Sequence, residues 1–122
     1  MKSTTILLVD DHQLLRAAWT EMLRLQLNLK VIGSTGFARE AIALAETQYP
    51  AIILLDLNMQ PVDGFELLPL LLQASPSSKV IAVYMYDLPA YAQRFIKLGG
   101  YGYVTKDSPL SEMLAAIGEV EQ

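Results

Sequence analysis

Five short apolar runs, separated by stretches of helical periodicity, are the feature that most constrains how this chain can fold. The runs are Ile6–Val9, Val31–Ile32, Ala51–Leu55, Val80–Tyr84 and Tyr101–Val104. Apolar residues recur at the spacing of one helix face in His12–Leu27, Ala38–Gln48, Asp63–Leu72, Pro89–Leu98 and Pro109–Val120. Strands that alternate with helices pair in parallel, because each helix supplies the long crossover that a parallel pair needs. We therefore expect an α/β domain, a doubly wound (βα)5 sandwich whose parallel sheet has the order 2-1-3-4-5.

Length and composition describe one domain with a substantial core. The chain has 122 residues, of which 52% are hydrophobic and 18% are charged, a balance typical of globular domains and unlike that of disordered segments. We expect residues 1–122 to form a single domain, with any output domain outside this chain. In the first expected helix, the core-facing stripe consists of Leu15, Ala18, Trp19, Met22 and Leu23.

Charge and residue usage exclude several classes of protein. The formal net charge is −4 and no basic run occurs, so we expect no direct contact between this segment and nucleic acid. The apolar runs are far shorter than the roughly 18 residues of a membrane span, and Asp10 and Asp11 interrupt any export signal. The chain also has no cysteine. These observations predict a cytoplasmic protein that makes no membrane contact.

Acidic residues follow two of the expected strands where their carboxyl ends meet. Asp10 and Asp11 follow the first strand, Asp56 follows the third, and Lys106 follows the fifth. A single Asp after a strand is usually a turn or capping residue, but like charges gathered in one crevice destabilise a fold that gains nothing from them. The site keeps two excess negative charges and offers oxygen ligands, with no His or Cys at ligand spacing. We therefore expect Mg²⁺, or else Mn²⁺.

Three segments carry a resemblance to a known family. They are Leu8-Val9-Asp10-Asp11-His12, then Asp56-Leu57-Asn58-Met59 with Asp63-Gly64, and Gly99 through Lys106. Over the whole chain they resemble the receiver domain of bacterial two-component response regulators, which implies a flavodoxin-like fold. The run from Asp11 to Arg16 is most similar to the branch that carries a C-terminal LuxR-type helix-turn-helix output domain. That likeness implies a role in transcription regulation.

The resemblance also implies a reaction and the residues that perform it. A partner histidine kinase would transfer a phosphoryl group to Asp56, giving an aspartyl phosphate. Asp11, Asp56 and the main-chain carbonyl of Asn58 would bind Mg²⁺, Asp10 would hold it through water, and Lys106 would bind a phosphoryl oxygen. Phosphoryl transfer depends mostly on positioning and charge neutralisation. We therefore expect the domain to catalyse its own phosphorylation and dephosphorylation and no other reaction.

Three residues depart from the family's pattern. Tyr84 stands where receivers carry Thr or Ser, and its oxygen lies farther from the backbone than a Ser hydroxyl does. Tyr84 would either swing out of the site or point in and crowd Asp56, although an aromatic residue packed at a strand end is an equally good explanation. Pro61 lies one residue later than usual, which predicts a reshaped loop. Pro69 falls inside the third helix and predicts a kink or a late start.

A cluster of aromatic residues points to a signalling surface. Tyr103 matches the switch aromatic of the family, and five of the six tyrosines lie between Tyr84 and Tyr103. The resemblance implies that helix 4, strand 5 and helix 5 contact an output domain or a second copy of the chain, so a homodimer is one expected assembly. A purely structural origin of the cluster remains open, since Tyr is common in strands and interfaces.

Other readings of the sequence are weaker. We expect the single histidine, His12, to begin a helix and shield the acidic loop and not to act in catalysis. The run 33–36 hints at the phosphate loop of a nucleotide or flavin site, but such a loop belongs after the first strand. A phosphatase of the haloacid dehalogenase type would need an acid where Asn58 stands. The principal alternative is a pseudo-receiver, an interaction module of the same fold that no longer switches by phosphorylation.

Overall fold

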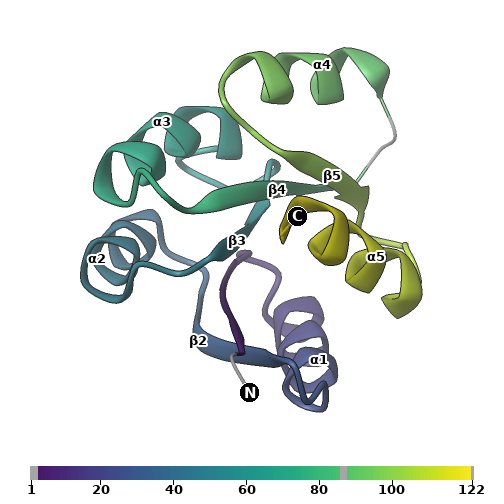
Figure 1. Ribbon diagram of the computed structural model, residues 1–122. Coiled ribbons are helices and arrows are strands. Elements are labelled where there is room, and N and C mark those ends of the chain that lie inside the picture. The colour runs from purple at the N-terminus through teal and green to yellow at the C-terminus, as the bar shows by residue number, and fades with distance from the viewer. Residues whose placement is uncertain (1–2, 86–87, 122) are drawn as a thin grey trace.

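Strands and helices alternate throughout the computed structural model, which describes residues 3–85 and 88–121 (Figure 1). None of the helices described there is long and apolar enough to span a bilayer. The strands are β1 (Thr4–Val9), β2 (Leu29–Thr35), β3 (Ile52–Asp56), β4 (Lys79–Tyr84) and β5 (Gly102–Thr105). The helices are α1 (Gln13–Arg24), α2 (Ala38–Gln48), α3 (Gly64–Ala74), α4 (Pro89–Lys97) and α5 (Leu110–Glu121).

The five strands form one parallel sheet with the order β2-β1-β3-β4-β5. This order confirms the predicted doubly wound fold. In the register of the central strands, Val9 of β1 pairs with Leu55 of β3. The residues that follow this pair, Asp10 and Asp56, therefore reach the carboxyl edge of the sheet at the same level. Parallel register is what turns two acids 46 positions apart into neighbours.

Helices cover both faces of the sheet, with α1 and α5 on one side and α2 and α3 on the other (Figure 1). Successive strand residues point to opposite faces, so Leu7 belongs to the core under α2 and α3, and Leu8 to the core under α1 and α5. Both cores are closed: Leu7, Leu23, Leu55 and Met113 are completely buried. Burial on two faces explains why the strands are unbroken apolar runs.

The first helix is shorter and its buried stripe narrower than predicted. It ends at Arg24, and Leu27 is 97% exposed in the turn that leads to β2. Within the predicted stripe, Trp19 and Leu23 are buried, whereas Ala18 is exposed. An Ala side chain gains little from burial, so it counts toward the periodicity without deciding which face packs.

Helix α3 runs uninterrupted from Gly64 to Ala74 through Pro69. It begins at Gly64, five residues before Pro69, so the expectation that the proline delays the start of the helix is wrong. Its first turn is held by Asp63, whose carboxylate accepts a hydrogen bond from the Glu66 N–H at 2.9 Å. Pro69 is exposed, whereas buried side chains of the same helix, such as Leu68, anchor the helix to the sheet. This packing compensates for the hydrogen bond that proline cannot donate.

Candidate functional site

Three carboxylates and one ammonium meet at the carboxyl edge of the sheet. Asp10 and Asp11 directly follow β1, Asp56 is the last residue of β3, and Lys106 directly follows β5. The Lys106 Nζ atom lies 3.0 Å from Asp56 Oδ2 and 3.5 Å from Asp10 Oδ1. The Lys106 main chain is fixed to the neighbouring strand, because its N–H donates to the Tyr84 carbonyl at 2.8 Å. The structure thus brings together the charged groups that the sequence placed at separate strand ends.

Asp56 is the most deeply placed of the acids, with no exposed surface. Its Oδ1 atom accepts a hydrogen bond from the main-chain N–H of Asn58 at 2.9 Å. Its Oδ2 atom forms the ion pair with Lys106 and has no other hydrogen-bond partner among the described residues. A buried carboxylate oxygen whose hydrogen bonding is incomplete remains available to a cation or to an incoming electrophile.

The surroundings of Asp56 raise the pKa of its carboxyl group to about 6. Loss of hydration on burial is the largest cause, and the negative charge of Asp10 adds to it. The Asn58 N–H and the Lys106 ammonium lower the pKa but do not offset the burial. The ionised form of Asp56 is therefore held in the fold at a cost that a bound cation would relieve.

Asp10 and Asp11 are fixed in different ways. Asp10 is buried, and its Oδ1 atom accepts a hydrogen bond from the His12 N–H at 2.8 Å. Asp11 is more open to solvent, and its Oδ2 atom accepts a hydrogen bond from the Gln60 N–H at 3.1 Å. The peptide bond between Gln60 and Pro61 is cis. Through the hydrogen bond from Gln60 to Asp11, the loop after β3, which contains the displaced proline, contacts the loop after β1 across the site.

Asn58 connects the loop after β3 to the end of β4. Besides the hydrogen bond from its N–H to Asp56, its side-chain Oδ1 atom accepts a hydrogen bond from the Met85 N–H at 3.1 Å. These two contacts fix the orientation of the Asn58 peptide beside the acids. The role of the Asn58 main-chain carbonyl in cation binding stays a prediction.

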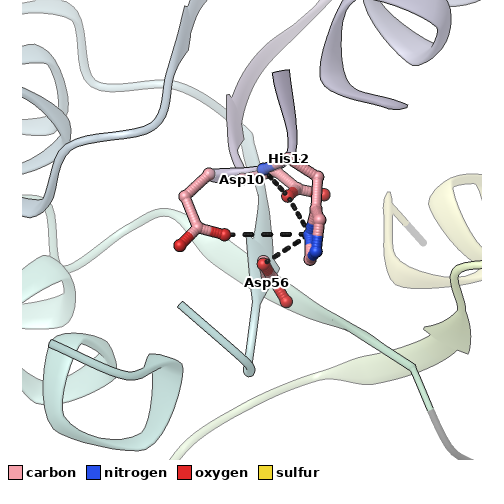
Figure 2. Close-up of side chains that lie close together, drawn as sticks. Asp10, His12 and Asp56 are labelled. Carbon is pink, nitrogen blue, oxygen red and sulfur yellow. Dashed lines mark hydrogen bonds and ion pairs between the residues drawn. The ribbon is translucent and has the colours of Figure 1, made fainter. Parts of the chain in front are cut away.

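His12 takes part in the cluster, contrary to the prediction that no histidine stands at ligand spacing. Its Nδ1 atom lies 3.3 Å from Asp10 Oδ1 and 3.8 Å from Asp56 Oδ2 (Figure 2). It precedes α1, as predicted, but its side chain makes no capping hydrogen bond. Spacing along the chain could not reveal this contact, because the direction of a ring in a loop depends on its rotamer.

The donor set of the site suits a divalent cation. One ligand atom from each of Asp10, Asp11, His12 and Asp56 can be chosen so that all four lie within 4.8 Å of one another. Three of these donors are carboxylates, the ligands that Mg²⁺ and Mn²⁺ prefer. The Asp56 Oδ2 atom, which has no second hydrogen bond among the described residues, lies 3.8 Å from His12 Nδ1. The residues present therefore fit the cation that the sequence predicts.

Tyr84 is buried and does not swing out of the site. Its side chain is 1% exposed and belongs to the core under α2 and α3. Its ring centroid lies 5.9 Å from that of Tyr103, whose side chain is 48% exposed on β5. Tyr84 thus fills space inside the sheet edge next to Tyr103. Tyr86, another member of the tyrosine cluster, lies outside the described residues.

The run 33–36 has a packing role that sequence reasoning missed. The Arg16 Nη1 atom donates a hydrogen bond to the Asp10 carbonyl at 2.9 Å. A Cβ atom placed on Gly36 would lie 2.6 Å from the same Nη1 atom. Because Gly36 has no side chain, the Arg16 guanidinium has room to reach the loop that carries the acids. This accounts for the glycine without a phosphate-binding function.

Fold and site together define a doubly wound α/β domain with an acidic cluster, which contains the buried Asp10 and Asp56, beside Lys106 at the carboxyl edge of the sheet. Comparison with known families is more specific, since residues 6–118 match the response regulator receiver domain. The chain belongs to this family and is a receiver domain of the kind found in two-component response regulators. Receiver domains are signalling domains, and no enzyme family is indicated.

Individual relatives agree with this assignment. Response regulator GacA of Pseudomonas aeruginosa is 34% identical over 115 residues, which are 94% of this chain and 54% of GacA. The nitrate/nitrite response regulator protein NarL of Escherichia coli is 33% identical over 93% of this chain and 52% of NarL. The chain thus spans about half the length of these relatives. A solved LuxR-family two-component response regulator from Aurantimonas sp. SI85-9A1 superposes with a TM-score of 0.91 at 27% identity, over 98% of this chain and 86% of that one.

Proposed function

We propose that this receiver domain accepts a phosphoryl group from a histidine kinase on Asp56 and transmits the change to an output that regulates transcription. The observation that carries the proposal is the complete burial of Asp56 with its Oδ2 atom 3.0 Å from the Lys106 ammonium. Relatives such as the transcriptional regulatory protein DegU of Brevibacillus brevis, 31% identical over 96% of this chain and 50% of DegU, support the type of output. The cytoplasm is the location that we predict.

The chemistry needs few groups from the protein. A carboxylate oxygen of Asp56 attacks phosphorus, so that an O–P bond forms while the P–N bond of the kinase phosphohistidine breaks and its electron pair stays on the imidazole. The nucleophile is already ionised above its pKa, so no base has to remove a proton. Lys106, whose Nζ atom lies 3.0 Å from Asp56 Oδ2, would neutralise the phosphoryl oxygens. Attack of water on the aspartyl phosphate would return the domain to its starting state.

The same residues bind the cation in this proposal. Bound Mg²⁺ neutralises negative charge on the carboxylates and on the phosphoryl oxygens. Asp11 and Asp56, together with the main-chain carbonyl of Asn58, hold it directly, and Asp10 holds it through water. Mn²⁺ is an alternative ion with the same oxygen preference. Asp11 is the partly exposed member of the set and would offer a carboxylate oxygen to the ion.

Intact mass measured after incubation with a small phosphodonor, with and without Mg²⁺, tests the proposal. The wild-type protein is expected to gain one phosphoryl group only with Mg²⁺, and Asp56→Asn none. Asp63→Asn is the matched control, because Asn at this helix cap keeps the hydrogen bond and leaves the cluster intact. A phosphoryl group on Asp56→Asn, or none on the wild type with Mg²⁺, would contradict the proposal.

The burial of Tyr84 supports a second candidate, the pseudo-receiver. A large side chain fixed in the core beside Tyr103 would keep the signalling surface in one state whether or not Asp56 is modified. This candidate predicts partner binding that does not change on phosphorylation. The first candidate predicts a change, and an increase in that change or in the lifetime of the phosphoryl group when Tyr84→Thr restores a small hydroxyl residue. Equal binding before and after labelling in both proteins would favour the pseudo-receiver.

The partner surface in this proposal is formed by α4, β5 and α5. Ile96 and Tyr103 are half-exposed and line a groove between α4 and β5 together with Lys97. We infer that this surface contacts the output domain or a second copy of the chain. Ile96→Asp is expected to abolish any phosphorylation-dependent homodimer in light-scattering measurements. The matched change Leu27→Asp, at an exposed position on the loop after α1, is expected to leave it intact.

A further inference from the structure

We propose that His12 is a protein ligand of the cation site and gives this site a preference for nitrogen-binding cations such as Ni²⁺ and Zn²⁺ over Mg²⁺. The inference rests on the proposed cation site and deepens it by adding one nitrogen to a set of oxygens. The chain has a single histidine and no cysteine. His12 is therefore the only imidazole or thiolate donor that the chain can offer.

The spacing of the donor atoms is suited to one ion. The His12 Nδ1 atom lies 3.3 Å from Asp10 Oδ1, 3.7 Å from Asp11 Oδ1 and 3.8 Å from Asp56 Oδ2 (Figure 2). Donor atoms bound to the same ion at about 2.1 Å lie about 3.0 to 4.2 Å from one another. The distances to Asp11 and Asp56, the two carboxylates proposed to bind the ion directly, fall inside this range, so small side-chain movements suffice to bring Nδ1 into the coordination sphere.

The lone pair of His12 already faces positive charge. The Lys106 ammonium contacts Asp10, Asp56 and the His12 Nδ1 atom. An ammonium can only donate, so a hydrogen bond in this contact requires the tautomer that has its lone pair on Nδ1. The ammonium thus occupies the position where a cation would find an imidazole nitrogen and two carboxylates.

The main chain places His12 while leaving the ring available. The His12 N–H donates to Asp10 at 2.8 Å, and the His12 carbonyl accepts a hydrogen bond from the Arg16 N–H at 2.9 Å. Its ring makes no capping hydrogen bond to α1. Replacing the ring therefore removes the nitrogen donor without removing a bond that the helix needs in order to begin.

The expected selectivity follows from the chemistry of the donor. Mg²⁺ prefers oxygen ligands and gives up its water reluctantly, so an added imidazole contributes little to its binding. Imidazole suits Ni²⁺ and Zn²⁺, and affinities at mixed nitrogen and oxygen sites rise toward the later first-row metals. Removal of His12 should therefore affect these two ions selectively.

Isothermal titration of the wild type, His12→Phe and His12→Asn with Ni²⁺, Zn²⁺ and Mg²⁺ tests the inference. Both variants are expected to bind Ni²⁺ and Zn²⁺ at least tenfold more weakly than the wild type and to bind Mg²⁺ within threefold of it. Circular dichroism verifies that each variant is folded. Pulsed electron paramagnetic resonance of bound Mn²⁺ is expected to show coupling to one imidazole nitrogen in the wild type and none in the variants.

The outcomes separate this inference from the proposed function. Equal Ni²⁺ and Zn²⁺ affinities in the wild type and in both folded variants would overturn the role of His12. Mg²⁺ binding and the phosphorylation of Asp56 could still be intact in that case. Asp11→Asn is expected to weaken the binding of all three ions, because it removes a shared oxygen ligand. If it weakens none of them, the cation site itself is wrong, and with it the Mg²⁺ dependence of the proposed reaction.

Discussion

Asp56 has no exposed surface, and burial raises the pKa of its carboxyl group from 3.8 to about 6. The folded protein therefore holds this proton more tightly than the unfolded chain does. As pH rises through the window from about 4 to 6, the unfolded chain loses the proton first. Above that window Asp56 is ionised in both states, and its burial lowers the stability of the metal-free fold. Below that window the carboxyl is protonated in both states, so the penalty vanishes.

Asp56→Asn is accordingly expected to stabilise the metal-free protein at pH 8. The shift in pKa corresponds to a gain of about 3 kcal/mol in the free energy of unfolding, which should shrink as the pH falls from 6 to 4. Urea denaturation in the presence of a chelator, at several pH values, measures it. Asp63→Asn should show no such pH-dependent gain, and a variant less stable than the wild type at pH 8 would refute the argument.

Tyr84 makes a prediction about packing that does not depend on signalling. Because its ring is buried and packs near Tyr103, Tyr84→Thr is expected to leave a cavity and lower the free energy of unfolding by about 3 kcal/mol. Tyr101→Thr is the control, since Tyr101 is 56% exposed, and its effect should stay below about 1 kcal/mol. Similar losses in the two variants would mean that Tyr84 is not a core residue.

Among the structural elements, the loop after β1 is held by a hydrogen bond from Arg16 of α1, which needs the space that Gly36 leaves just beyond β2. Arg16 lies one turn into α1 and donates to the Asp10 carbonyl, while Gly36 lies just beyond β2. A side chain at Gly36 would meet the Arg16 guanidinium and would also lie 3.2 Å from the Asp10 carbonyl. The two residues should therefore be coupled energetically.

A double-mutant cycle measures this coupling. Gly36→Ala is expected to destabilise the wild type by more than it destabilises the Arg16→Ala variant, with a difference of about 1 kcal/mol in the free energy of unfolding. Part of the cost remains in the double variant because of the backbone contact with Asp10. Additive effects of the two changes would show that Arg16 does not occupy the slot beside Gly36.

The residue that follows α2 has a strained main-chain conformation. Tyr49 follows the helix with φ of 47°, a left-handed conformation that favours glycine. Its side chain is exposed, so little packing is lost on its removal. Tyr49→Gly is expected to raise the free energy of unfolding by about 1 kcal/mol. Tyr49→Ala should bring no such gain, and thermal unfolding of the three proteins distinguishes these results.

In the whole molecule, the proposed cation site joins the carboxyl ends of β1 and β3 to the start of the loop after β5. A ligand that binds only the folded chain stabilises it by mass action. Mg²⁺ at one hundred times its dissociation constant is therefore expected to raise the free energy of unfolding by about 2.7 kcal/mol. Asp11→Asn should lose most of this gain in the same denaturation experiment. Equal stabilisation of both proteins would place the ion elsewhere.

Much of this architecture can be predicted from the chain alone. The apolar runs and helical stretches locate all five strands and helices within a few residues, and the order 2-1-3-4-5 is confirmed. Asp10, Asp56 and Lys106 can be placed at one sheet edge because strand ends and register are consequences of local pattern and parallel pairing. The errors, such as the extension of α1 to Leu27, occur where apolar residues have no partner to pack against.

Other features were decided only by tertiary packing. The turn of the His12 ring into the acidic cluster, the slot at Gly36 that admits Arg16, and the burial of Tyr84 are all choices of side-chain direction. A rotamer is selected by neighbours from distant parts of the chain, whereas periodicity reports only which face of an element is apolar. Sequence pattern therefore determined the fold and the position of the carboxylates, and three-dimensional contact determined which further groups reach them.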